Sequence, residues 1–116
     1  MIPADARLLR IYLNSSERWN NRPAYQVVVE TARRLNLAGA SVFQAELCYG
    51  NERRLRDVQS DYEFADIAVV VEIVEAPEQV VRLLDELGDR IKDALICIEP
   101  ARVVALKPET PPRPIP

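Results

Sequence analysis

Three closely spaced arginines, Arg53, Arg54 and Arg56, are the side chains of this sequence best suited to bind an anion. A guanidinium stays charged at every cellular pH and presents a fixed fork of donors that matches two phosphate oxygens at once. Gly50, just before them, would let the backbone approach a ligand closely because it has no side chain. The pattern indicates a candidate anion site. A solvated loop, whose arginines pair with neighbouring acidic residues, is the alternative.

This sequence offers little for transition-metal binding or acid-base catalysis. It contains no histidine, the commonest general base and transition-metal ligand. Its two cysteines, Cys48 and Cys97, lack metal-ligand spacing, and we interpret both as small buried hydrophobic residues. No nucleophile, base and acid form a recognisable set. We therefore expect no metal site, no catalytic residues and no enzymatic activity.

The composition indicates a single globular domain. The chain has 116 residues, 48% of them hydrophobic and 28% charged. It has no apolar run of the ~20 residues that span a bilayer. Its net charge of -3 gives no broad basic field for nucleic acid. The N-terminus lacks the features of a secretory signal, so we expect a cytoplasmic protein without membrane insertion.

The residues before the arginines follow the order strand, helix, strand. Residues 8–13 alternate between two faces, which predicts a strand. Pro23 suits the first turn of a helix whose apolar stripe ends near Leu37. Gly39 can then take the left-handed turn that returns the chain. Residues 41–49 alternate with one mostly polar face, so we expect a strand at the edge of a sheet.

The same order recurs after the arginines. Residues 67–74 are apolar on both faces except for Glu72, which is typical of a central strand covered on both sides. For Glu72 we expect a salt bridge to an arginine of another subunit. Pro77 suits the start of a second amphipathic helix, and Gly88 predicts that this helix ends or bends there.

The last strand is predicted within residues 96–106, and the break at Pro100 favours residues 102–106. Residues 107–116 contain five prolines and predict an extended or disordered tail. The domain organisation that we expect is one domain at residues 1–106 and a proline-rich tail at residues 107–116.

Two right-handed β-α-β units predict an α+β, ferredoxin-like β-α-β-β-α-β sandwich. Its four-stranded antiparallel sheet has the first and third strands in the centre and two helices on one face. The arginines then lie in a long loop, residues 51–63, between the second and third strands. The other face would expose apolar side chains and favours a homo-oligomer packed sheet against sheet. The candidates for that patch are some of Leu8, Tyr12, Ala68, Val70 and Val74.

Four segments form an ordered set across residues 8–106: Leu9-Arg10-Ile11-Tyr12-Leu13, Trp19 followed by Arg22-Pro23-x-Tyr25, Leu37-Ala38-Gly39-Ala40-Ser41-Val42, and Asp66-Ile67-x-Val69-Val70-Val71-Glu72-Ile73-Val74. This set resembles the PII-like family catalogued as domain of unknown function 190. The resemblance implies a ferredoxin-like fold, a homotrimer, and a regulatory rather than a catalytic role.

In PII proteins, adenine nucleotides bind in clefts between subunits, beneath the loop that corresponds to residues 51–63. The resemblance thus implies an adenine nucleotide as ligand and no covalent cofactor. It implies a loop that signals to a partner such as a membrane transporter or channel. The candidate ligand-binding residues are Gly39, Gly50, Arg53, Arg54 and Arg56, of which Arg54 matches a family arginine. Turn geometry is the alternative role for Gly39. A small enzyme of acylphosphatase type and a ligand-free oligomeric interaction module remain alternative functions.

Overall fold

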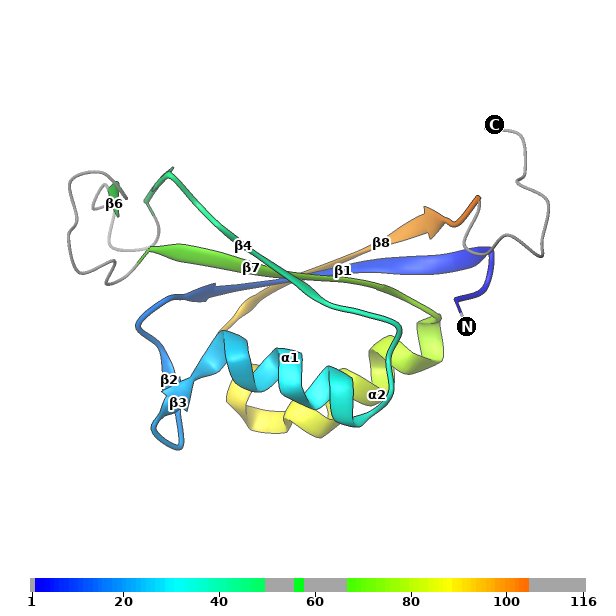
Figure 1. The fold of residues 1–116 in the computed structure, drawn as a ribbon, viewed down its shortest axis with the longest axis horizontal. Helices are drawn as coiled ribbons and strands as arrows, with labels where there is room; N and C mark the ends of the chain where they lie inside the picture. The colour runs from blue at the N-terminus through cyan, green and yellow to red at the C-terminus, as the bar shows by residue number, and fades with distance from the viewer. Residues whose placement is uncertain (1, 50–55, 58–66, 105–116) are drawn as a thin grey trace.

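A single four-stranded antiparallel sheet with two helices on one face organises the protein (Figure 1). The computed structural model describes residues 2–49, 56–57 and 67–104. In chain order the elements are β1 (Asp5–Asn14), β2 (Arg18–Trp19), β3 (Arg22–Pro23), α1 (Ala24–Arg34), β4 (Ser41–Gln44), β5 (Leu47–Cys48), β6 (Arg56–Asp57), β7 (Ala68–Glu75), α2 (Pro77–Leu87), the 3-10 helix η1 (Gly88–Ile91) and β8 (Leu95–Arg102). The predicted α+β, ferredoxin-like fold is confirmed.

The strand order β4-β7-β1-β8 places β1 and β7 in the centre, as the sequence predicts for its first and third long strands. Both central strands pair antiparallel along nearly their full length, from Arg7 opposite Glu75 to Asn14 opposite Ala68. The edge position predicted for residues 41–49 is also confirmed, but the strand of the main sheet is shorter and ends at Gln44.

The last strand begins earlier than the sequence predicts. It runs through Leu95–Arg102 and includes Pro100, whereas the prediction favoured residues 102–106 of the 96–106 segment. Pro100 lies opposite Arg7 on a strand that pairs only with β1 in the described part of the chain. A proline is tolerated at a sheet edge because its missing N–H need not serve a second neighbour. The predicted tail at residues 107–116 lies outside the described residues.

The core lies between the sheet and the helices. Alternate residues of the two central strands face α1 and α2 and are at most 5% exposed: Leu9, Ile11, Leu13, Val69, Val71 and Ile73. The helices cover them with Val28, Val80 and Leu83, which recur at helical spacing and are also buried. None of the helices in the described part of the chain combines the length and apolar character needed to cross a bilayer.

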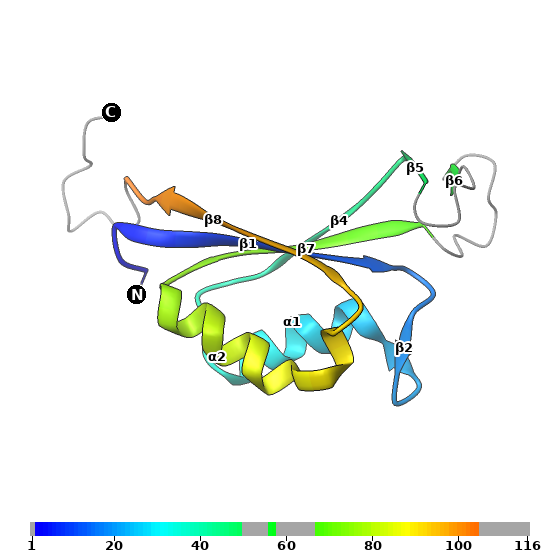
Figure 2. The same cartoon turned by 180° about the vertical axis from the view of Figure 1, so that it is seen from behind.

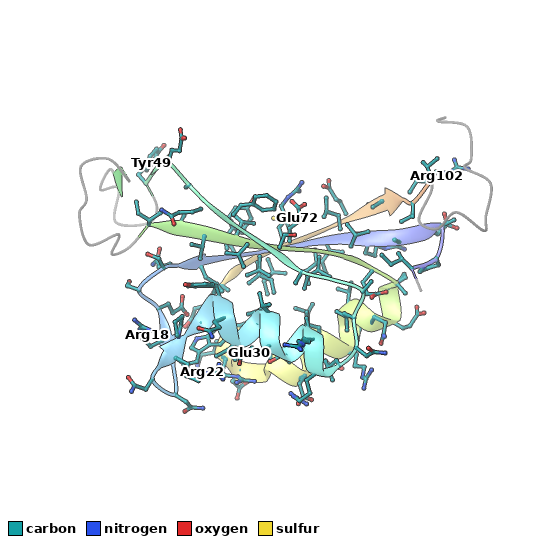
Figure 3. The ribbon with its side chains drawn as sticks, in the orientation of Figure 1. Arg18, Arg22, Glu30, Tyr49, Glu72 and Arg102 are labelled. Carbon is teal, nitrogen blue, oxygen red and sulfur yellow. The ribbon has the colours of Figure 1, made fainter. Side chains whose placement is uncertain are left out.

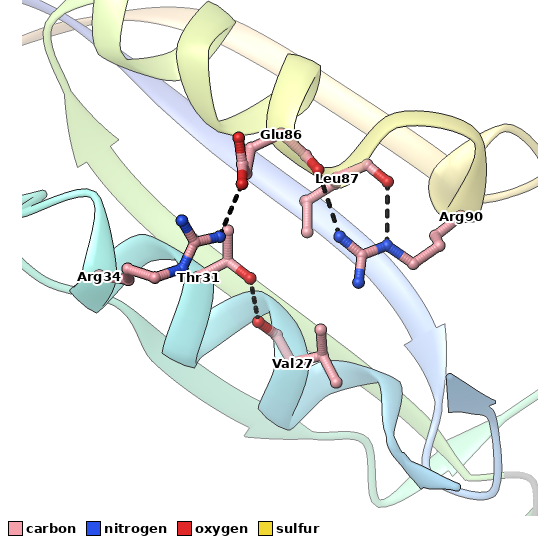
Figure 4. A network of polar contacts seen from close by, with 6 residues as sticks. All are labelled: Val27, Thr31, Arg34, Glu86, Leu87 and Arg90. Carbon is pink, nitrogen blue, oxygen red and sulfur yellow. Dashed lines mark hydrogen bonds and ion pairs between the residues drawn. The ribbon is translucent and has the colours of Figure 1, made fainter. Parts of the chain in front are cut away.

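Polar contacts join the two helices on the side away from the sheet (Figure 4). Arg34 of α1 donates a hydrogen bond of 2.8 Å to Glu86 of α2. That bond lowers the pKa of the Glu86 carboxyl below its ordinary value. Arg90 donates to the carbonyl oxygens of Leu87 and Glu86, at 3.1 and 3.2 Å, and so satisfies backbone acceptors at the end of α2.

A buried carboxylate fixes the return from α1 to β4. Glu75, at the end of β7, is 4% exposed. Its Oε2 accepts a hydrogen bond of 2.8 Å from the backbone N–H of Ala38, and its Oε1 accepts one of 2.8 Å from the N–H of Ala76. Glu75 therefore ties the chain that precedes β4 to the point where α2 begins.

The left-handed turn predicted at Gly39 is wrong, and the helix end or bend predicted at Gly88 is confirmed, because α2 ends at Leu87. The positive φ angle after α1 belongs to Asn36, at 63°, while Gly39 lies outside the left-handed region. Asparagine tolerates this conformation because its short polar side chain bonds locally. Gly88 ends α2 with φ 59° and ψ -136°, a combination that side chains disfavour strongly.

Replacing Gly88 by alanine is expected to destabilise the fold by roughly 1 to 3 kcal/mol, the usual cost of a backbone held in a disfavoured region. A Cβ at this position would meet no atom within 4 Å, so the loss comes from the backbone alone. Urea unfolding monitored by circular dichroism measures it. Gly39→Ala is the matched control, since a Cβ there also meets nothing and φ is permissive. Equal unfolding midpoints for the two variants would contradict the expectation.

Candidate functional site

The long connection between β4 and β7 contains a short two-stranded sheet, formed by β5 and β6. The backbone N–H of Ala45 donates to the carbonyl of Ala68, at 2.9 Å, and so extends the pairing of β4 with β7 by one step. Beyond it, β5 pairs with β6, with Leu47 opposite Asp57 and Cys48 opposite Arg56. Figure 2 shows both short strands beyond the ends of β4 and β7, and we call this the loop end of the sheet.

The candidate anion-binding residues belong to this connection. The ladder places the backbone of Arg56 at the base of the loop, opposite Cys48. Gly50, Arg53 and Arg54 lie outside the described residues. The β5–β6 ladder therefore closes the base of residues 49–55, the segment that contains Gly50, Arg53 and Arg54, and Arg56 belongs to β6 itself.

Gly39 belongs to the connection between α1 and β4, two residues before β4 begins, and Figure 1 shows that connection at the end of the sheet opposite the loop end. The backbone N–H of its neighbour Ala38 donates to Glu75, the last residue of β7. The loop end of the sheet lies at Ala68, the first residue of β7. The strand between those two residues is about 23 Å long at 3.3 Å per residue. Within one chain, Gly39 and Arg56 therefore cannot contact the same small ligand.

The face of the sheet opposite the helices, which we call the open face, carries apolar side chains across all four strands. The register places Phe43 beside Val70, Val70 beside Tyr12, and Tyr12 beside Leu95. These four residues form the apolar row. Leu95 is 62% exposed and Phe43 is 54% exposed. The predicted apolar patch is thus present, and it extends onto both edge strands.

A group of three charged side chains lies next to the apolar row. Arg10 Nε lies 3.2 Å from Glu72 Oε2, and Arg10 Nη1 lies 2.9 Å from Glu99 Oε1. These residues form the charge triad, and Figure 3 shows Glu72 on the open side of the sheet. The bonds from Glu99 and Glu72 raise the pKa of Arg10, against a smaller opposing effect of burial. The structure thus pairs Glu72 with an arginine of the same chain, not of another subunit as the sequence predicted.

The connection between β1 and α1 folds as a small hairpin. Asn20 and Asn21 form its tip with positive φ angles of 51° and 65°, between β2 and β3. Arg22 is paired with Glu30 on the helical layer, and its hydrogen bond lowers the pKa of that carboxyl (Figure 3). An acylphosphatase-type site would need an open phosphate loop in this connection, so the hairpin gives that alternative no support.

Metal-binding and thiol features are sparse in the part of the chain that the structure describes. No group of three or more histidine, cysteine, aspartate or glutamate side chains there could hold a metal ion. The prediction that Cys97 is buried is wrong, because Cys97 is exposed on the edge strand β8. It lies opposite Arg10, on the open face. The side chain of Cys48 lies outside the described part.

Sequence reasoning missed the contributions of Phe43, Leu95 and Glu99 to the open face. The sequence offers little indication of this role, because Leu95 and Glu99 belong to β8, which was predicted at a later position. Once the register of β8 is known, Leu95 falls beside Tyr12 and Glu99 beside Leu8. The same alternation that predicted the central strands then assigns both to the open face.

The comparison with protein families gives one match across nearly the whole chain. Residues 6–103 match the DUF190 family, described as "Uncharacterized ACR, COG1993". Among curated proteins, the chain is similar to the UPF0166 protein of Aquifex aeolicus (strain VF5). The two are 32% identical over 100 residues, which cover 86% of this chain and 94% of the relative.

Solved structures with the same fold include two PII-like proteins. One comes from Thermus thermophilus, and its name describes it as a PII-like signalling protein. It matches with a TM-score of 0.65 and 18% identity, over 89% of this chain and 93% of that chain. The other is CPII of Thiomonas intermedia K12, a nitrogen regulatory PII-like protein bound to ADP, AMP and bicarbonate. It matches with a TM-score of 0.65 and 12% identity, over 85% and 88% of the two chains. Identities this low show a shared fold alone.

Proposed function

The chain belongs to the DUF190 family, and on that basis we propose that it is a PII-like regulatory protein that binds an adenine nucleotide between the subunits of a homotrimer. Binding changes the loop at residues 51–63, and the loop signals to a partner such as a membrane transporter or channel. The protein acts in the cytoplasm and catalyses no reaction. It uses neither a metal nor a covalent cofactor.

The observation that carries this proposal is the β5–β6 ladder, which closes residues 49–55 at the start of the loop. The ladder follows β4 at the loop end of the sheet, and Arg56 lies in its second strand. A segment anchored at both ends and rich in arginine can change its arrangement when an anion binds, because only a difference in affinity between two arrangements is needed. CPII, which shares the fold, is bound to ADP and AMP.

The position of Gly39 supports a site between subunits. Within one chain, Gly39 and Arg56 are separated by the length of β7. A ligand that contacts both residues must therefore lie between two copies. In the proposed cleft, one subunit supplies Gly50, Arg53, Arg54 and Arg56. The neighbouring subunit supplies Gly39, which is exposed and accessible to a ligand.

Two properties of the sheet support self-association. The apolar row is exposed at both edges of the open face, and exposed apolar patches of this kind mark interfaces. Within the described chain, β4 and β8 each pair on one side only. These edges are different surfaces, so contact between them is head-to-tail and generates a ring where the rotation closes.

Removing the three loop arginines together is expected to weaken nucleotide binding strongly. Each hydrogen bond to a charged group contributes about 1.5 to 3 kcal/mol, so the variant Arg53→Ala, Arg54→Ala, Arg56→Ala should bind at least ~100-fold more weakly. Isothermal titration calorimetry with ATP, ADP, AMP and cyclic AMP measures this. Wild-type protein should bind at least one of the four.

Arg34→Ala serves as the control for lost positive charge. Arg34 is bonded to Glu86 between the helices, away from the loop, so its removal should leave nucleotide affinity unchanged. No heat from wild-type protein with any of the four nucleotides would refute the ligand assignment. Unchanged affinity in the triple variant would refute the role of the loop arginines.

A further inference from the structure

The charge triad has one more acid than base. Arg10 bonds to both Glu72 and Glu99, which leaves the three side chains with a net charge of about −1 when all are ionised. The bonds raise the pKa of Arg10, so the guanidinium keeps its single positive charge, which can balance only one of the two carboxylates. One carboxylate charge therefore remains uncompensated among the residues that the structure describes.

The surroundings of the triad on the open face offer no further charge in the described part of the chain. In the register, the row of Arg10 includes Ser41 on β4, Glu72 on β7 and Cys97 on β8. The rows on either side bring Tyr12, whose phenol is neutral at cellular pH, and the apolar residues Leu8, Val70, Val74 and Leu95. The helices lie on the other face (Figure 1).

Glu99 is the carboxylate that assembly would affect most. Its side chain is 54% exposed and lies on an edge strand, whereas the side chains of Glu72 and Arg10 are each 34% exposed. Glu99 therefore has the most water to lose when another copy covers the open face. Removing water from an uncompensated charge is costly, and a proton or an opposite charge must then offset it.

We propose that self-association through the open face is coupled to proton uptake at the charge triad, with Glu99 as the carboxylate that takes up the proton. Assembly then strengthens as the pH falls. This inference rests on the homotrimer of the proposed function and adds a means of regulating it. Each copy contributes one triad, so the number of protons taken up equals the number of copies assembled.

One substitution distinguishes proton uptake by Glu99 from a salt bridge between Glu99 and the neighbouring copy, because the two cases predict opposite effects on assembly. If an arginine or lysine of the neighbouring copy paired with Glu99, then Glu99→Gln would remove that pair and weaken assembly. If Glu99 must instead be neutralised, Glu99→Gln supplies a neutral side chain of the same shape and strengthens assembly at high pH. Asp85→Asn, an exposed carboxylate exchange on α2, is the matched control.

Fluorescence-detected sedimentation of the full chain, from nanomolar to micromolar concentration, tests the inference between pH 5.5 and 8.5. Wild-type association should weaken as the pH rises, by up to about tenfold per pH unit for each coupled proton. Glu99→Gln should associate more tightly than wild type at pH 8.5 and lose most of the pH dependence, while Asp85→Asn should match wild type. Where dissociation lies below the nanomolar range, the exchange rate of labelled subunits gives the same comparison.

Two results would overturn the inference. One is association of wild-type protein that does not change with pH, and the other is weaker or equally pH-dependent association of Glu99→Gln. Both leave the homotrimer in place. Wild-type protein that stays monomeric at every pH would instead refute the homotrimer of the proposed function itself.

Discussion

Replacing Leu95 by glutamate is expected to dissociate the proposed homotrimer into folded monomers. Leu95 ends the apolar row on β8 and is 62% exposed in the single chain, so the fold does not depend on its side chain. In a sheet-to-sheet interface the new carboxylate would be buried without a partner, which costs several kcal/mol. The association constant should fall at least ~100-fold. Sedimentation velocity gives the mass, and circular dichroism confirms that the chain stays folded.

Val81→Glu controls for the introduction of a charge at an exposed apolar position. Val81 is 57% exposed but lies on α2, in the helical layer. We expect this variant to assemble like wild type. The open face would be excluded as the interface if Leu95→Glu kept the mass of the wild-type assembly. It would also be excluded if the two variants dissociated equally.

Exchanging the buried carboxylate Glu75 for an amide is expected to be the most destabilising polar substitution in the described part of the chain. Both oxygens of Glu75 accept backbone hydrogen bonds, from Ala38 and Ala76. The amide of glutamine can accept only one of them and turns its NH₂ group toward the other N–H. A donor left unpaired in a buried site costs about 1 to 3 kcal/mol, and more where a charge is involved.

Urea unfolding of Glu75→Gln measures that loss, and Glu86→Gln makes the same chemical exchange at an exposed position. Glu86 accepts one hydrogen bond from Arg34 on the surface of the helical layer, and exposed pairs contribute about 0 to 1 kcal/mol. The free energy of unfolding should fall clearly more for Glu75→Gln. If both variants lost the same amount, Glu75 would not be the anchor of the α1–β4 return.

The sequence predicts the central architecture because periodicity carries it. In the two central strands, alternate residues are apolar and face the helices, as Leu9, Ile11 and Leu13 do in β1. This alternation is unambiguous in the sequence. The edge strands are harder to predict, since an edge strand buries little and tolerates residues that a central strand excludes. The sequence-based prediction placed β8 too late because it treated Pro100 as a break in the strand. The apolar row and the charge triad can be recognised only from the correct register of β8.

The candidate site could be predicted only in part. Local chemistry nominates arginines and glycines, but it cannot tell which of them lie at the same end of a sheet. The separation of Gly39 from Arg56 depends on the direction of β4 and on the bond from Ala38 to Glu75, neither of which appears in a local pattern. The partner of Glu72 likewise follows from the register of β1 and β7, which places Arg10 directly opposite it.

The most direct test of the proposed nucleotide site is a crystal structure of the protein grown with the nucleotide that binds most tightly in calorimetry. We predict density for that nucleotide between two copies, with its phosphates in contact with Arg53, Arg54 or Arg56 of one copy. The 39–41 segment of the neighbouring copy should lie against the same molecule. Nucleotide density held within a single chain, or clefts between copies that remain empty at saturating nucleotide, would contradict the account.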